Sequence, residues 1–136
     1  MGKKIFEITA TVRFKLTEED VTDLVVGALE GGIGYWSILD NSGKEFTDAP
    51  KEEAISETAA RILIEGGELR FFDVEDKSES WILDMEKLAQ GIRRFVEEGY
   101  DQYGVFSCNG ADMGMCDAEG CDTIFQLALF DKIVFC

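Results

Sequence analysis

The chain contains no histidine, a single proline and no long apolar run. Without histidine it lacks the commonest metal ligand and the side chain that most often serves as a general base near neutral pH. No apolar stretch approaches the roughly 18 residues that indicate a membrane span. The Met-Gly-Lys-Lys start also lacks the apolar centre of a signal peptide. We therefore expect a cytoplasmic protein whose four cysteines are reduced.

Basic residues are scarce as well. There are 13 Lys and Arg against 28 Asp and Glu, which gives a net charge of −15. A field of this sign repels nucleic acid and anionic membranes and attracts basic partners or cations. Because 46% of the 136 residues are hydrophobic, we still expect one folded domain over residues 1–136. No catalytic or cofactor motif stands out, so the sequence favours a non-enzymatic protein without a cofactor.

Residues 21–36 predict an amphipathic helix, a double-glycine stop and a short aromatic strand. Apolar residues recur there at the spacing of one helix face, at Val21, Leu24, Val25, Ala28 and Leu29. Thr17 fits the N-cap with Asp20 in the capping-box position. Gly31 and Gly32 are expected to end the helix in a left-handed conformation. A similar helix with a double-glycine stop recurs further along, around residues 54–67.

The remaining patterns complete an α+β fold. Residues 5–16 alternate between apolar and polar side chains, which predicts a long strand with one buried face. Further strands are expected over residues 34–39, 68–74, 80–83 and 132–136, and helix starts at Thr17, at Thr47 or Asp48 before Pro50, at Asp84 and at Asp117. We expect a mostly antiparallel sheet of about five strands with four helices packed mainly on one face. Residues 100–119 are expected to form a long loop.

Three patterns could carry chemistry and none matches a known site. Cys108, Cys116, Cys121 and Cys136 lack the paired C-x2–4-C spacing of zinc sites, so no metal is predicted, although zinc at the first three is left open. The acidic residues Asp112, Asp117, Glu119 and Asp122 lack the calcium-loop pattern. The glycines at 31, 32 and 34 follow a helix, whereas phosphate-binding glycines precede one.

The strongest functional signal is a segment of one charge sign. Residues 97–131 contain eight acids and no Lys or Arg, together with two tyrosines. Carboxylates steer basic partners and tyrosines serve as anchors in protein interfaces. We predict a partner-binding surface for a basic protein; its residues are Tyr100, Asp101, Tyr103, Asp112, Asp117 and Glu119. The competing interpretation is that the charge serves solubility alone and that the tyrosines cover the edge of the core.

A second functional class is a small-molecule or signalling-nucleotide binder. Its aromatic pocket would use Tyr35 and Trp36, with Tyr100 and Tyr103 as further candidates. Phosphates would require bases, and Arg93-Arg94 is the only adjacent basic pair beyond Lys3-Lys4. The sequence leaves the oligomeric state open, a homodimer included.

Three segments carry a resemblance to known sequences. They are residues 28–36 (ALEGGIGYW), residues 65–69 (EGGEL) and residues 118–135 (AEGCDTIFQLALFDKIVF). In these the chain resembles a group of small acidic proteins of unassigned function encoded by phages and mobile elements of Firmicutes. The resemblance implies an accessory protein of a mobile element. Many such proteins counter host defence, CRISPR systems among them, so it implies an inhibitor of a host protein by analogy.

Overall fold

The computed structural model describes residues 2–136 and is mainly helical, with 43% helix and 12% strand. The helical segments are α1 (Glu18–Gly27), η1 (Ala28–Gly32), α2 (Lys44–Thr47), α3 (Ile55–Ile64), α4 (Met85–Glu97), η2 (Met113–Met115) and α5 (Ala118–Phe130). The strands are β1 (Ser37–Leu39), β2 (Leu69–Asp73), β3 (Ser80–Leu83), β4 (Phe106–Ser107) and β5 (Gly110–Ala111). None of the helices in residues 2–136 is long and apolar enough to cross a membrane.

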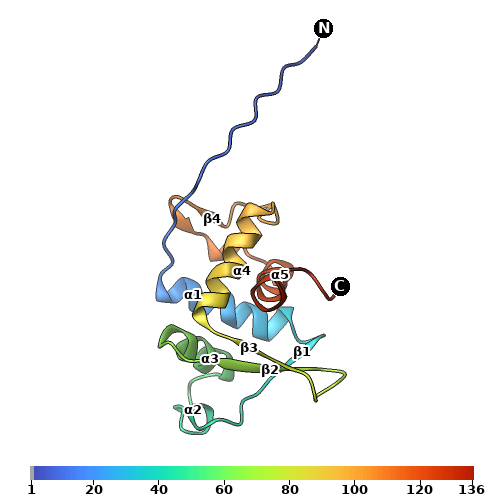
Figure 1. Ribbon diagram of the computed structural model, residues 1–136. Coiled ribbons are helices and arrows are strands. Elements are labelled where there is room, and N and C mark those ends of the chain that lie inside the picture. Colours follow the sequence, from blue (N-terminus) through green and yellow to red (C-terminus); the bar gives the residue numbers. More distant parts are fainter. Residues whose placement is uncertain (1) are drawn as a thin grey trace.

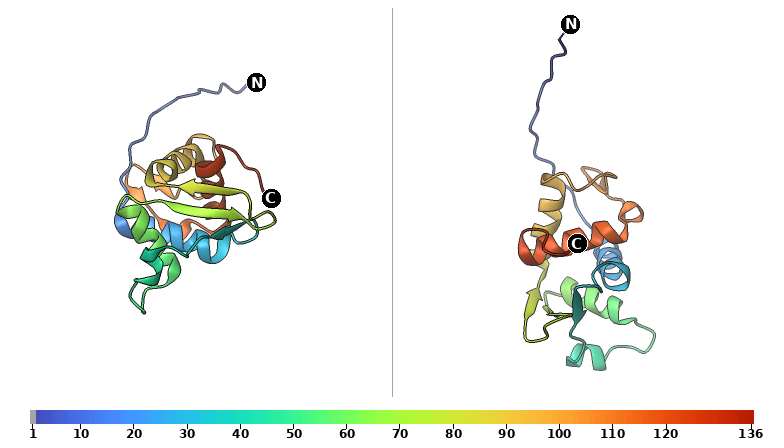
Figure 2. Two further views of the ribbon diagram at one scale, coloured as in Figure 1. Left: turned by 60° about the horizontal axis from the view of Figure 1, so that its bottom comes forward. Right: turned by 90° about the vertical axis from the view of Figure 1, so that its right-hand side faces the viewer.

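The α+β class is confirmed, but the single sheet of about five strands is wrong. The strands form a three-stranded antiparallel sheet in the order β1-β2-β3 and a separate β4–β5 hairpin. In the larger sheet Leu69 lies opposite Leu83 and Phe71 opposite Trp81. The sheet lies at one end of the molecule and the short hairpin at the other, with the helices between and around them (Figures 1 and 2).

Both predicted terminal strands are absent from these sheets. Residues 2–16 are extended but have no neighbouring strand, and they lead away from the folded body (Figure 1). Only Phe14 and Leu16 of this segment pack against the core. Residues 132–136 also form no strand: Lys132 lies in a bend, and the residues after it have no strand pairing. Alternation of apolar and polar residues is typical of a strand, but a strand also needs a partner to pair with. Within residues 2–136 neither segment pairs with another strand.

The helix starts follow the capping predictions closely. Thr17 Oγ1 accepts a hydrogen bond from Asp20 N (3.0 Å), and the Asp20 carboxylate accepts one from Thr17 N (2.9 Å). Asp84 and Asp117 accept from the backbone three residues on, each at 2.8 Å. The exception is the second predicted helix: α3 starts after Ala54, not at Pro50, and the predicted connection before Pro50 contains the short helix α2.

The predicted left-handed stop at Gly31-Gly32 is wrong. The helix continues through η1, a π-helical turn closed by Ile33 N donating to Ala28 O at 2.9 Å. Gly32 is required by close packing, because a Cβ there would lie 2.9 Å from the Ala118 carbonyl oxygen. The left-handed glycine stop does occur at Gly66, where φ is +90° and which ends α3.

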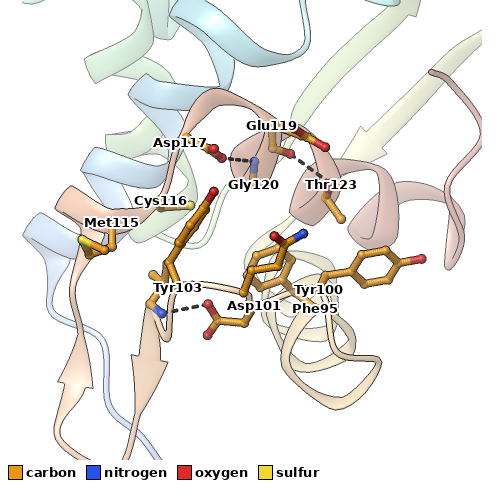
Figure 3. A pocket seen from close by; sticks show the side chains of 12 residues that line it. Phe95, Tyr100, Asp101, Tyr103, Met115, Cys116, Asp117, Glu119, Gly120 and Thr123 are labelled. Atoms are coloured by element: carbon orange, nitrogen blue, oxygen red, sulfur yellow. Dashed lines mark hydrogen bonds between the residues drawn. The ribbon is translucent and has the colours of Figure 1, made fainter.

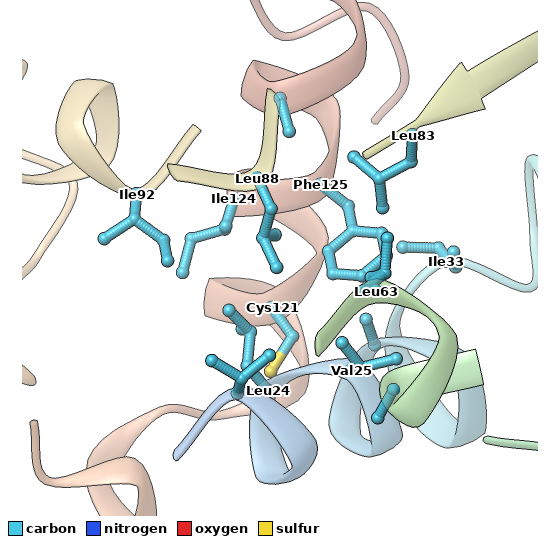
Figure 4. Packing of buried hydrophobic residues seen from close by; sticks show 14 of the residues in the cluster. Leu24, Val25, Ile33, Leu63, Leu83, Leu88, Ile92, Cys121, Ile124 and Phe125 are labelled. Carbon is cyan, nitrogen blue, oxygen red and sulfur yellow. The ribbon is translucent and has the colours of Figure 1, made fainter. Parts of the chain in front are cut away.

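The core surrounds α5. Side chains from α1, α3, α4 and β3 converge on Cys121, Ile124 and Phe125 of this helix (Figure 4). Trp36 and Phe71 are buried. Helix α4 approaches most closely at Gly91, where a Cβ would lie 2.6 Å from the Ile124 carbonyl oxygen.

Gly91→Ala should therefore destabilise the protein even though alanine favours helix by about 1 kcal/mol. The methyl group meets backbone atoms of α5, which cannot rotate away, so we expect the free energy of unfolding to fall by about 1–3 kcal/mol. Gly34→Ala is the matched control, since a Cβ there has nothing within 4 Å. Urea denaturation that shows equal stability for the two variants would refute the close α4–α5 contact.

Candidate functional site

A small concavity lies where the C-terminal end of α4 meets the N-terminal end of α5. We call it the acidic hollow and define it by its main lining residues, Phe95, Tyr100, Asp101, Tyr103, Asp117 and Glu119. Figure 3 shows Tyr103 on the side of Met115 and Cys116, and Tyr100 on the opposite side near Phe95. The hollow has a volume of about 80 Å³.

The end of α4 places Tyr100. Gly99 adopts φ +80°, and Tyr100 N donates to Phe95 O at 3.0 Å, which closes the helix with a Schellman turn. This reversal lays the Tyr100 ring nearly parallel to Phe95, with 6.4 Å between ring centroids and an angle of 15°. Tyr100 therefore lies against the buried Phe95 at the end of α4, with one side in solvent.

Asp101 and Asp117 each combine a charge with a structural role. The Asp101 carboxylate accepts hydrogen bonds from Val105 N (2.8 Å) and Phe106 N (3.0 Å), which folds the turn that carries Tyr103. Asp117 caps α5, where the positive end of the helix dipole favours its charge and that of Glu119. The predicted loop over residues 100–119 is thus ordered by its own acids and by the β4–β5 hairpin and η2.

The arginines neutralise one side of the acidic segment only. Arg93 lies 3.7 Å from Glu97, and Arg94 lies 3.4 Å from both Glu98 and Asp131. Within residues 2–136 the other five acids of the segment have no Lys or Arg nitrogen within 4.0 Å. Three of these five, Asp101, Asp117 and Glu119, line the acidic hollow.

Five of the six predicted partner-binding residues therefore lie around one hollow: Tyr100, Asp101, Tyr103, Asp117 and Glu119. Asp112 is exposed but does not line it. Its backbone N–H instead donates to Val105 O at 2.7 Å, next to the hairpin.

The four residues suggested for a ligand pocket are not brought together. Trp36 is buried, and its indole N–H donates to Asp122 at 2.8 Å. Tyr35 lines a separate open cavity of about 640 Å³ with Asp122, Gln126 and Phe135, and in the described part of the chain no Lys or Arg lines it. Arg93 and Arg94 are in the ion pairs with acids described above.

The sequence analysis missed the structural role of Asp122 and Gln126. Asp122 accepts hydrogen bonds from Tyr35 Oη (2.6 Å), Trp36 Nε1 and Gln126 Nε2 (2.9 Å). The buried Gln126 accepts from Val134 N and Phe135 N, both at 2.8 Å, and so holds the C-terminal segment. Phe135 then stacks on Trp36 with centroids 5.1 Å apart. A glutamine within the apolar face of the last helix was the available signal.

Two of the four thiols lie close together. Cys116 and Cys121 have their sulfur atoms 3.7 Å apart, whereas Cys108 and Cys136 are exposed. The hydrogen bond between the pair lowers the pKa of Cys116 and raises the pKa of Cys121, which burial raises further. Among residues 2–136 no three His, Cys, Asp or Glu side chains lie close enough to hold a metal ion.

No protein-family model, curated protein or solved structure matches the chain.

The Tyr35–Asp122 contact gives a pH-dependent prediction. Partial desolvation, then the hydrogen bond to Asp122 and its charge, raise the pKa of Tyr35 to about 12, against about 10 in an unfolded chain. The stabilisation is therefore complete below about pH 10 and is lost as the pH rises through about 12.

Tyr35→Phe should lower the free energy of unfolding by about 1 kcal/mol at pH 7–9, with the difference shrinking above about pH 10. Tyr103→Phe is the control, because the Tyr103 hydroxyl makes no hydrogen bond within residues 2–136. Chemical denaturation over this pH range measures both variants, and a pH-independent difference for Tyr35→Phe would contradict the assignment.

Proposed function

We propose that this is a non-enzymatic binding protein whose acidic hollow engages a basic surface of another protein. The observation that carries the proposal is the convergence of Tyr100, Tyr103, Asp101, Asp117 and Glu119 on one concavity without a neutralising base. Asp101 and Asp117 hold the turn and cap α5, and Glu119 adds a third carboxylate beside the same two exposed aromatic rings.

The dimensions of the hollow favour a protein partner over a small ligand. Its volume of about 80 Å³ is far below the roughly 300–1,000 Å³ of small-molecule pockets. It has room for the end of one long side chain. Tyr103 is 58% and Tyr100 40% exposed, so their rings are available to a cation. A lysine or arginine of the partner would meet three carboxylates there and could lie against a ring face.

The nucleotide-sponge alternative receives no such support. The larger cavity beside Tyr35 has room for a small molecule, but Glu119 and Asp122 line it and would repel phosphates. The arginines suggested for that role are in ion pairs on α4 and with Asp131.

The resemblance to proteins of mobile elements extends the proposal to the kind of partner. A host defence protein with a basic, nucleic-acid-binding surface would be attracted by the same charges, and the acidic hollow would occupy that surface. The partner class rests on the resemblance and the binding chemistry rests on the hollow, so the two can be tested apart.

The test is a variant, called the hollow variant, that changes two charges of the hollow and the exposed charge of Asp112 outside it, and that keeps the structure. Asp112→Lys and Glu119→Lys reverse two exposed charges, and Asp117→Asn removes a third while an asparagine still caps α5. The control changes the net charge equally on exposed acids elsewhere, by Glu52→Lys, Glu68→Lys and Glu79→Gln. Neither triple variant should lower the melting temperature by more than a few degrees.

Immobilised wild-type protein and the control should capture the same basic proteins from a host lysate at low salt. Capture should weaken at higher ionic strength, where the range of charge interactions falls to about 8 Å. The hollow variant should capture them at least about tenfold less, and Tyr103→Ala should mainly speed their dissociation. Equal capture by both triple variants, or none by the wild type, would overturn the proposal.

A further inference from the structure

The N-terminal arm, residues 2–16, packs against the core of its own chain only near its end, through Phe14 and Leu16. Ile5, Phe6 and Ile8 are 91%, 81% and 86% exposed. Among residues 2–136, no backbone hydrogen bond involves an N–H or C=O of the arm. The arm thus presents an apolar stripe and two free strand edges, which is the condition for pairing with another chain.

The arm is also the one basic part of an acidic chain. It carries four bases and one acid, namely Lys3, Lys4, Arg13, Lys15 and Glu7, whereas residues 17–136 carry nine bases and 27 acids. Opposite charge therefore favours contact between the arm of one copy and the body of another.

The order of residues in the arm is self-complementary about Ala10. In an antiparallel pair of arms centred there, each residue lies opposite the one equally distant from Ala10. On one face Phe6 meets Phe14 of the partner subunit, and Ile8 meets the partner's Val12. On the other face Glu7 meets the partner's Arg13. Aromatic, β-branched and opposite-charge pairs are those that stabilise antiparallel strands.

We propose that two copies dimerise by pairing their arms antiparallel, with a two-fold axis at Ala10. The symmetry produces every contact twice, as a closed dimer interface requires. A shift by one residue would place apolar side chains opposite polar ones, and a shift by two would separate Glu7 from Arg13 and Phe6 from Phe14.

The body receives the end of the partner's arm. Phe14 stacks on Phe106 of β4 with centroids 5.4 Å apart, so the partner's Phe6 would extend this pair into an aromatic cluster. Beyond it, the partner's Lys3 reaches Thr17, immediately before the acids Glu18, Glu19 and Asp20 of α1. The ends of the arm pair thus gain apolar cover and opposite charge, which an isolated two-stranded ribbon in water lacks.

The arm could also pair with the sheet edge of an unrelated protein. The self-complementary order of residues about Ala10 favours a second copy of this chain. Binding to an unrelated strand requires alternation only. It does not require Glu7 and Arg13, or Phe6 and Phe14, to be equidistant from one residue.

Sedimentation equilibrium of the full chain under reducing conditions tests the pairing. We expect a dimer whose dissociation constant rises about tenfold with Ile8→Asp, because the cross-strand pair of Ile8 with the partner's Val12 is lost twice. Ile5→Asp is the matched control: it makes the same change on the other face, opposite the partner's Lys15, and should leave the dimer intact. Residues 5 and 8 are exposed, so circular dichroism should show both variants fully folded.

Charge exchange tests the register. Glu7→Arg and Arg13→Glu each place like charges opposite one another and should weaken the dimer several-fold, whereas the double exchange restores opposite charges and should recover it. A wild-type chain that stays monomeric overturns the proposal. So does a dimer that tolerates Ile8→Asp, or a double exchange as weak as the single variants.

Discussion

The structure depends on how closely other segments approach α5. Gly32 in η1 brings its backbone against the N-terminal end of this helix and Gly91 in α4 against its C-terminal half. A Cβ at these positions would lie within 3 Å of the carbonyl oxygens of Ala118 and Ile124. Gly27 makes room for Cys121 in the same way, since its Cβ would lie 3.0 Å from the sulfur. A methyl group added at Gly32 or Gly91 would meet backbone atoms of α5 and would force the packed segments apart.

The same placement creates the acidic hollow. Because α4 runs against α5, the Schellman turn at Gly99 delivers Tyr100 and the loop of Tyr103 beside the N-terminus of α5. Arg93 and Arg94 lie about one turn earlier on α4. They pair with Glu97, Glu98 and Asp131, which are acids outside the hollow. A helix N-terminus stabilises the carboxylates that a basic partner would meet.

Sequence patterns predicted what local chemistry decides. Thr17, Asp84 and Asp117 cap helices as expected, since capping depends on a few adjacent residues. Tyr100, Tyr103, Asp117 and Glu119 were also assigned to one surface, on the single charge sign of their segment; the turns and the hairpin that bring them together were not predicted. The pairing of strands was not predictable in the same way, because it depends on segments that are distant in the sequence. Residues 5–16 have the periodicity of a strand but no partner strand within residues 2–136. Gly32 was predicted to stop the helix. The structure instead requires glycine there because α5, far along the sequence, leaves no room for a Cβ. Asp122 and Gln126 were missed because a buried hydrogen-bond network leaves no periodic trace.

The central claim is that the acidic hollow is the place where positive charge binds. Titration of the ¹⁵N-labelled protein with a short arginine-rich peptide, followed by amide chemical shifts, tests it most directly. If the peptide binds in the acidic hollow, the amides of Tyr100, Asp101, Tyr103, Glu119 and Thr123 shift first, and these shifts disappear as salt is added. Shifts spread over all exposed acids, or centred on α3 and the three-stranded sheet, would contradict it.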